Sequence, residues 1–449
     1  MHRTVPEQAL PEEEGAEEPI IDPTEEAYQA ITLAVTLGDP EEAIDAYEEA
    51  QLADPDDPGT QVLLANLYIT AGDIEQAEAI LDEILLEHPD NIDALYSRSL
   101  TAAAAGNEDE QREYLQRLLA LEGDHTAALA ALGELDLRDE KYQEAASSFE
   151  AALDADPENF VALVGLGNVH LRTEAPEEAR DVLDRVIEME PEYSFAYTDR
   201  SRAYILEYNF TEAERDLSTA IDLEPDYFWN FYDRGKVRNE LRDYEGAVTD
   251  FSRVIEEAPD IFMTYIYRAR AYDGLGMKDE AIADYEQARS MEPAYTGAAT
   301  PLAALYFETE RYEDAFTLFD AAYQASDEPG RSRDDGMALM AALCLKYGGD
   351  ERGGRRYIEE AAASFPRPGI AWEVARYFVD PGYNNYVLQQ VEAVNDPVLQ
   401  GRMKFYLAAH FELEGNRNTA RALYLDIFDV EALTGFVEMR LAQYMYNRI

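Results

Sequence analysis

Residues 228–261 read FWNFYDRGKVRNELRDYEGAVTDFSRVIEEAPDI, and residues 262–295 read FMTYIYRARAYDGLGMKDEAIADYEQARSMEPAY. The two stretches have equal length and place alanine, an aromatic residue and proline at the same spacing. The proline recurs every 34 residues, at Pro55, Pro89, Pro157, Pro191, Pro225, Pro259 and Pro293, with Gly123 in the one remaining place. Twelve residues earlier stand Ala43, Ala77, Ala145, Ala179, Ala213, Ala247 and Ala281, with Gln111 as the exception. A fixed period of this length indicates a helical repeat array rather than one compact core.

Each 34-residue unit, counted from Thr24, carries the pattern of two amphipathic helices. Apolar residues fall at positions 4, 7 or 8 and 11 of a unit, and again at positions 20, 24 and 27, so each set has helical spacing. Acidic residues such as Glu177 open the second helix, where they favour the positive end of its dipole. The proline then ends that helix. The sequence therefore predicts an all-α fold, an α-solenoid in which each unit packs on its neighbours.

The seventh and eighth units carry a recognisable set of markers. These are Phe231, Gly235, Tyr244, Ala247, Phe251 and Pro259 in one, and Tyr265, Ala269, Tyr272, Gly276, Ala281, Tyr285 and Pro293 in the other. This pattern resembles the tetratricopeptide repeat family over residues 24–329. The resemblance implies a superhelix whose first helices line a concave groove. The third unit departs most, because Ser99, Gln111 and Gly123 stand at marker places.

Three segments follow from this pattern. Residues 1–23 form an acidic, proline-rich leader that we expect to be disordered, because it has little apolar surface to bury. Residues 24–329 hold the regular repeats. In residues 330–449 the period is lost but helical pairing continues, and a single helix at Leu433–Met445 is expected to cover the last apolar face. The whole chain is thus predicted to hold about twelve helix pairs and a capping helix.

The composition limits the class of partner. A formal charge of −58 repels nucleic acid and anionic membrane surfaces, so we expect neither as a partner. No stretch approaches the roughly 20 consecutive apolar residues of a membrane span, and we expect no membrane insertion. As written, the chain reads as cytoplasmic, or as periplasmic or extracellular if an upstream leader has been removed. Five lysines among 36 basic residues fit either a high-salt host or a GC-rich genome.

Arginine stands at position 7 of three consecutive units, and aspartate sixteen residues later. The predicted pairs are Arg200 with Asp216, Arg234 with Asp250, and Arg268 with Asp284. Because position 7 should face the second helix of its own unit, we interpret these residues as three internal ion pairs.

Positions 2, 5, 9 and 12 of a unit form one stripe of its first helix, because they are three or four residues apart. We call this the first-helix stripe, and the family resemblance places it in the concave groove. Its aromatic and cationic members in units five to eight suit an acidic peptide or a chain-terminal carboxylate. The predicted binding residues are Asn168, Phe195, Arg202, Trp229, Tyr232, Lys236, Asn239, Met263 and Arg270. Alternatively, the cations only neutralise nearby acids such as Asp199, Asp233 and Asp273.

No motif for catalysis, a cofactor or a metal is recognised. The five histidines share no ligand spacing, and neither a phosphate-binding glycine loop nor a nucleophile elbow occurs. The sequence thus predicts a non-catalytic scaffold or adaptor that binds a partner peptide in its groove. The alternative is an envelope-associated or periplasmic assembly factor that organises a larger complex through its convex face or ends. The oligomeric state stays open.

Overall fold

A computed structural model describes residues 23–50, 52, 57–325, 334–380, 382 and 384–449. The predicted disordered leader lies almost wholly outside this range. The chain divides into two compact units, one ending at Leu206 and the other beginning at Glu207, and each is considered by itself.

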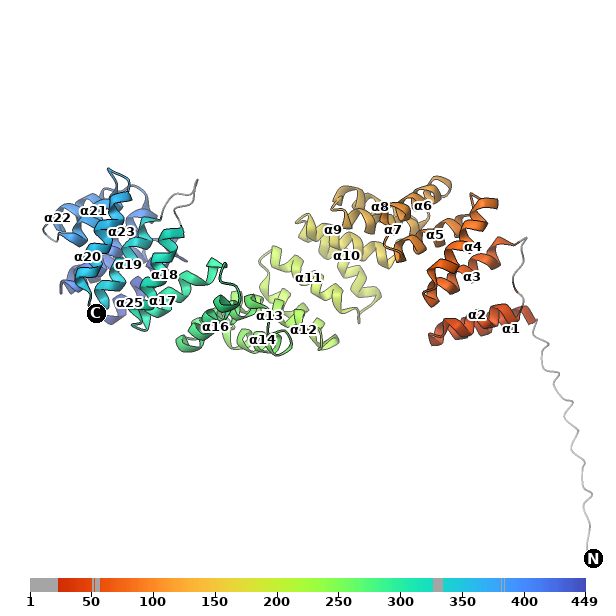
Figure 1. The fold of residues 1–449 in the computed structure, drawn as a ribbon, viewed down its shortest axis with the longest axis horizontal. Helices are drawn as coiled ribbons and strands as arrows, with labels where there is room; N and C mark the ends of the chain where they lie inside the picture. Colours follow the sequence, from red (N-terminus) through yellow and green to blue (C-terminus); the bar gives the residue numbers. More distant parts are fainter. Residues whose placement is uncertain (1–22, 51, 53–56, 326–333, 381, 383) are drawn as a thin grey trace, which may run out of the picture. The chain divides into compact units, whose positions relative to one another are not determined.

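Every regular element in the described part of the chain is a helix (Figure 1). The α-helices of the first unit are α1 (Pro23–Leu37), α2 (Pro40–Glu49), α3 (Pro58–Ala71), α4 (Ile74–Glu87), α5 (Ile92–Ala104), α6 (Glu108–Leu121), α7 (Thr126–Arg138), α8 (Tyr142–Ala155), α9 (Phe160–Arg172), α10 (Pro176–Met189) and α11 (Ser194–Leu206). Those of the second unit are α12 (Phe210–Leu223), α13 (Phe228–Leu241), α14 (Tyr244–Glu257), α15 (Phe262–Gly274), α16 (Lys278–Met291), α17 (Ala299–Glu308), α18 (Tyr312–Ala325), α19 (Asp335–Tyr347), α20 (Glu351–Ala361), α21 (Ile370–Val379), α22 (Asn384–Glu392), α23 (Pro397–Leu413), α24 (Arg417–Phe428) and α25 (Val437–Arg448).

The predicted fold class is confirmed, with consecutive helices packed in pairs and one unpaired helix at the end. The last helix begins at Val437, four residues later than predicted, because residues 431–433 form a short 3-10 turn. The connection that follows this turn passes through Gly435, whose φ of 95° suits glycine.

Position 15 of each repeat ends the first helix in the left-handed conformation. Glycine fills this position in four repeats and has φ between 72° and 80°, while five repeats have another residue there. The glycines are Gly38, Gly72, Gly106 and Gly276, and the other residues are Glu140, Glu174, Tyr208, Arg242 and Glu310. The turn geometry that the repeats share therefore does not depend on glycine alone.

The periodic alanines and the residues four positions after them form the contacts inside each repeat. Ala247 and Phe251 of α14 are fully buried, and a Cβ added to Gly235 of α13 would lie 2.8 Å from the Phe251 ring. The third repeat keeps this packing although Gln111 replaces the alanine, since Gln111 and Leu115 are both buried.

Two of the three predicted arginine–aspartate pairs are confirmed. Arg234 Nη2 lies 2.8 Å from Asp250 Oδ1, and Arg268 Nε lies 2.7 Å from Asp284 Oδ2. Each arginine also donates to a serine of the preceding repeat, Arg234 to Ser218 at 3.1 Å. The arginines therefore join three helices, and link neighbouring repeats as well as the two helices of one repeat.

The arginine pairs of the first unit connect repeats in the same way. Arg200 pairs with Asp184 of the preceding repeat at 2.6 Å, whereas its predicted partner Asp216 belongs to the second unit, so that pair stays a prediction. Arg98, which the sequence analysis did not single out, also stands at position 7. It binds Asp82 of the preceding repeat at 2.9 Å.

We predict that Arg234→Ala lowers the free energy of unfolding by about 3 kcal/mol, because it removes a partner from the buried Asp250. Arg238 still donates to this carboxylate, which keeps the loss near the lower end for such a pair. Urea denaturation followed by circular dichroism measures the change. Arg215→Ala, at an exposed arginine of α12, serves as the control, and equal unfolding midpoints for the two variants would refute the structural role.

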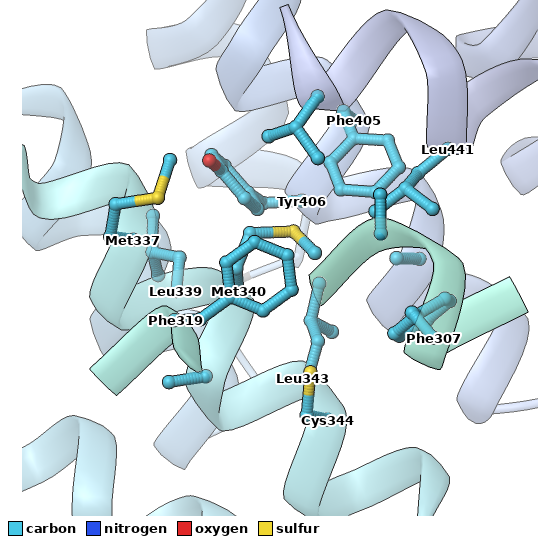
Figure 2. Packing of buried hydrophobic residues seen from close by; sticks show 14 of the residues in the cluster. Phe307, Phe319, Met337, Leu339, Met340, Leu343, Cys344, Phe405, Tyr406 and Leu441 are labelled. Atoms are coloured by element: carbon cyan, nitrogen blue, oxygen red, sulfur yellow. The ribbon is translucent and has the colours of Figure 1, made fainter. Parts of the chain in front are cut away.

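The second unit ends in a closed bundle with a continuous apolar core. Figure 2 shows side chains from α17, α18, α19, α23 and α25 meeting in it, among them Phe307, Met340, Phe405 and Leu441. The last helix was expected to cover the last apolar face. It packs on α23 and α24 but also on α17, which stands more than a hundred residues earlier in the chain.

Two polar clusters, one partly and one fully buried, hold α25 in this place. Arg440 lies 2.6 Å from Glu308 of α17 and 2.5 Å from Asp273 of α15. On the other side, Glu438 is fully buried and accepts hydrogen bonds from Arg402 and from the Tyr406 hydroxyl. Losing either arginine would leave a carboxylate without its main partner inside the protein, so these clusters fix the helix in one position.

His410 of α23 is buried between the rings of Tyr377 and Phe378, and neither of its ring nitrogens has a hydrogen-bond partner in the described part of the chain. Burial lowers its pKa to about 3, and the nearby Lys346 acts in the same direction against the opposing Glu351. Because the pKa of His410 is lower in the folded than in the unfolded protein, its neutral side chain makes its full contribution to stability above about pH 6.5. This contribution falls as the pH decreases toward 3.

Through His410, the wild-type protein should lose about 2 kcal/mol of its free energy of unfolding between pH 7.5 and pH 5. We predict that the His410→Leu variant does not show this loss. Urea denaturation at the two pH values measures this, with hydrogen-exchange mass spectrometry reporting on α23. His88→Leu, at an exposed histidine of the first unit, is the control. The same pH-dependent loss in His410→Leu as in the wild type would contradict the assignment.

Candidate functional site

The first-helix stripe of the second unit begins with an aromatic cluster on α13. Trp229 stands one helical turn before Tyr232, and their ring centroids lie 5.5 Å apart, edge to face. Phe228 supports the other side of Trp229 at 4.9 Å. Trp229 nevertheless remains 41% exposed, so a large apolar side chain is held in a fixed position and presented to solvent.

Tyr232 connects this cluster to the next repeat. Its ring lies 5.8 Å from that of Tyr267 on α15 and 6.2 Å from that of Phe251 on α14. Partial burial, with smaller contributions from Tyr267 and Asp233, raises the pKa of Tyr232 well above its usual value. Its hydroxyl therefore stays protonated at any physiological pH and can donate a hydrogen bond.

The three predicted cations differ in how strongly neighbouring acids hold them. Lys236 lies 3.2 Å from Asp233 and also 5.4 Å from the centre of the Tyr232 ring. In the first unit, Arg202 lies 2.7 Å from Asp199. These two cations therefore fit the alternative prediction, in which the cations of the stripe neutralise neighbouring acids.

Arg270 of α15 fits that alternative least well. Asp273, its expected neighbour, is bound by Arg440, and the nearest described carboxylate to Arg270 is Glu240 at 3.8 Å. The Arg270 side chain is 53% exposed. Arg270 is therefore the most weakly held of the three cations.

The remaining predicted residues have different surroundings. Asn239 is only 8% exposed and donates to the Tyr267 carbonyl at 3.0 Å, which favours a role in packing. Met263 is partly buried against the core of the second unit. Phe195 and Asn168 belong to the first unit, where Phe195 is 40% exposed and Asn168 borders a cavity of about 520 Å³ with Arg138 and Arg172. The predicted site thus has members in both units, and the second unit holds most of them.

Two cavities beside α25 were not predicted from the sequence. One is a shallow depression of about 510 Å³, widely open to solvent, and is lined by Arg270, Asp273, Lys278, Glu308, Arg440 and Gln443, among others. The other, of about 480 Å³, is lined mainly by apolar side chains, including Pro301, Ala304, Phe428, Phe436, Val437 and Met439. Arg440 and Gln443 border both cavities. The sequence feature that could have pointed to these cavities is in the ninth repeat, whose first-helix stripe carries the small residues Thr300 and Ala304.

No described group of histidine, cysteine and carboxylate side chains is arranged to hold a metal ion. Among the helices described, none has the length and apolarity that crossing a membrane requires.

Comparison with known proteins places the repeats in a family. Models of the tetratricopeptide repeat match residues 34–101, 136–197 and 267–329. No curated protein matches the sequence. Among solved structures, the MamA protein is 23% identical over 38% of this chain and 93% of its own, with a TM-score of 0.36. A tetratricopeptide repeat protein from Parabacteroides merdae is 20% identical over 57% of this chain and 98% of its own, with a TM-score of 0.41.

A further structure, PilW, described as a type IV pilus biogenesis factor, is 19% identical over 46% of this chain and 96% of its own, with a TM-score of 0.42. The sequence period, the paired helices and the matching family models agree with one another. The chain contains tetratricopeptide repeats over these matched residues.

Proposed function

We propose that this protein is a non-catalytic interaction scaffold that captures a peptide segment of a partner protein on the first-helix stripe of its second unit. The observation that carries the proposal is the exposed Trp229, fixed by two ring contacts beside Lys236 and Tyr232. Tryptophan, tyrosine and arginine are the residues that most often anchor protein interfaces. Because Trp229 is already ordered, binding would cost little side-chain entropy there.

The cations of the stripe remain usable although two of them have acidic neighbours. Lys236 and Asp233 form a partly exposed pair, and such pairs contribute about 0–1 kcal/mol. A carboxylate of the partner can therefore replace Asp233 at little cost. The position-7 arginines are different, because exchanging the buried Asp250 for an external partner would disrupt the repeat. The position in the repeat thus distinguishes the proposed binding cations, at position 9, from the structural arginines, at position 7.

The charge of the whole chain restricts the partner further. At −58, the protein repels a long acidic tract at a distance. A partner segment with one or two carboxylates close to an apolar side chain avoids most of this repulsion and still pairs with Lys236 and Arg270. We therefore propose a short, mixed acidic and apolar segment as the bound peptide.

We predict that Trp229→Ala combined with Lys236→Glu abolishes capture of the partner while the circular dichroism spectrum and melting temperature stay unchanged. Affinity purification from the source cells with quantitative mass spectrometry compares this variant with the wild type. Arg215→Glu is the matched charge control, since this arginine is exposed on α12 and has only a 3.6 Å contact with Glu212. Retention of the same partners by the double variant would refute the proposal.

A further inference from the structure

The two cavities beside α25 share a wall formed by Arg440 and Gln443, so groups bound in them would be neighbours. We infer that together they bind a short motif of the partner peptide, in which a carboxylate stands about two to four residues from a large apolar side chain. This inference rests on the proposed function, because it names the chemistry of the peptide at the end of the same stripe.

The first cavity has a local excess of positive charge in a strongly negative protein. Its lining includes three cations, Arg270, Lys278 and Arg440, against the two carboxylates of Asp273 and Glu308. Arg440 pairs with both carboxylates, and Lys278 lies 2.9 Å from Glu308. The remaining cation is Arg270, whose nearest described carboxylate is 3.8 Å away. Its guanidinium suits a carboxylate, either of a side chain or of a chain terminus.

The second cavity suits an apolar side chain. Its volume of about 480 Å³ falls in the usual range for ligand sites, and most of its walls are apolar. Its lining includes Thr300 and Ala304, at positions 5 and 9 of the ninth repeat. Tyr232 and Lys236 hold the same two positions in the seventh. A peptide that follows the stripe from α13 to α15 would therefore reach this cavity at the next first helix.

Gln443 stands between the cavities and is exposed to solvent. Its side-chain amide carries donors and an acceptor, and it can therefore pair with a peptide group of an extended backbone. Such a contact would align the peptide so that one side chain enters each cavity. This arrangement favours a peptide over a small apolar molecule.

The walls of both cavities are held in place before any partner binds. Arg440 fixes α25 to α15 and α17, while Glu438 fixes it to α23 through Arg402 at 2.6 Å. Phe436, at the rim, also lies over the Arg402 guanidinium at 5.6 Å from its ring centre. The buried ion pairs thus keep the apolar cavity from closing, because α25 cannot move toward the small residues of α17.

A random library of ten-residue peptides, displayed on phage and selected on the full chain, tests the inference. We expect the selected peptides to combine Asp or Glu with Leu, Met, Phe or Trp two to four residues away. Selection on Thr300→Trp, which fills the apolar cavity, should lose the apolar preference and keep the acidic one. Thr434→Trp fills the cavity from an exposed rim position, so it serves if the first variant folds poorly. Arg270→Gln should lose the acidic preference instead.

Fluorescence polarisation of selected synthetic peptides then measures the coupling. Replacing the apolar residue of a peptide by serine should weaken binding roughly ten-fold or more on the wild type, but less than about two-fold on either tryptophan variant. Comparing free with amidated carboxyl termini shows whether the carboxylate comes from a side chain or a chain end. Thr300→Val, which keeps the size of the side chain, is the control and should bind like the wild type.

The outcomes separate this inference from the proposed function. Acidic peptides without an apolar preference, whose binding depends on Trp229, would overturn the inference and leave the proposed function standing. An apolar preference that survives both tryptophan variants would also overturn it. A selection on the wild type that enriches no peptide would contradict both.

Discussion

The two short helices of one repeat cannot cover each other's apolar faces, so every repeat of this chain must bury its surface against a neighbouring repeat. That constraint decides the use of almost every position in the 34-residue unit. The periodic alanines lie at helix contacts, the residues four positions later fill the space between helices, and the position-7 arginines of the second unit connect adjacent repeats. Few positions remain free for binding a partner, and the first-helix stripe holds many of them.

The last repeat of such a stack has no neighbour on one side, so its apolar face there must be covered in another way. The second unit does this by folding α25 back onto α17 and by anchoring it with Arg440 and Glu438. These anchors are buried and ionic, and such groups fix one geometry more than they add stability. They also hold α25 in the walls of two cavities, one of which is lined by Arg270.

The period explains what could be predicted from the sequence. Arg234 and Asp250 are sixteen residues apart, and the register alone places them on facing helices of one repeat. Contacts between repeats also follow from the register, but Ser218 as a second partner of Arg234 was missed, because a serine in a helix gives no signal of its own. For the binding residues, register placed Trp229 and Lys236 on a common face, although it could not show that Asn239 on the same stripe is buried.

Contacts between residues whose separation does not follow the 34-residue period could not be predicted. Arg440 and Asp273 are separated by 167 residues, and only the fold of the last helices brings them together. The cavities beside α25 depend on this contact and were missed for the same reason. The unusual feature that was visible in the sequence was the loss of the period after Pro329, in the part of the chain that holds α19 to α25.

Site-specific photocrosslinking tests the central claim most directly. Trp229→p-benzoylphenylalanine places a photoreactive group on the first-helix stripe, and Tyr208→p-benzoylphenylalanine places it at an exposed turn of the same unit, off the stripe. If the stripe captures a partner peptide, illumination in the source cells yields a crosslinked protein from position 229 and not from position 208. Crosslinking from position 208 alone, or none from position 229, would contradict the account.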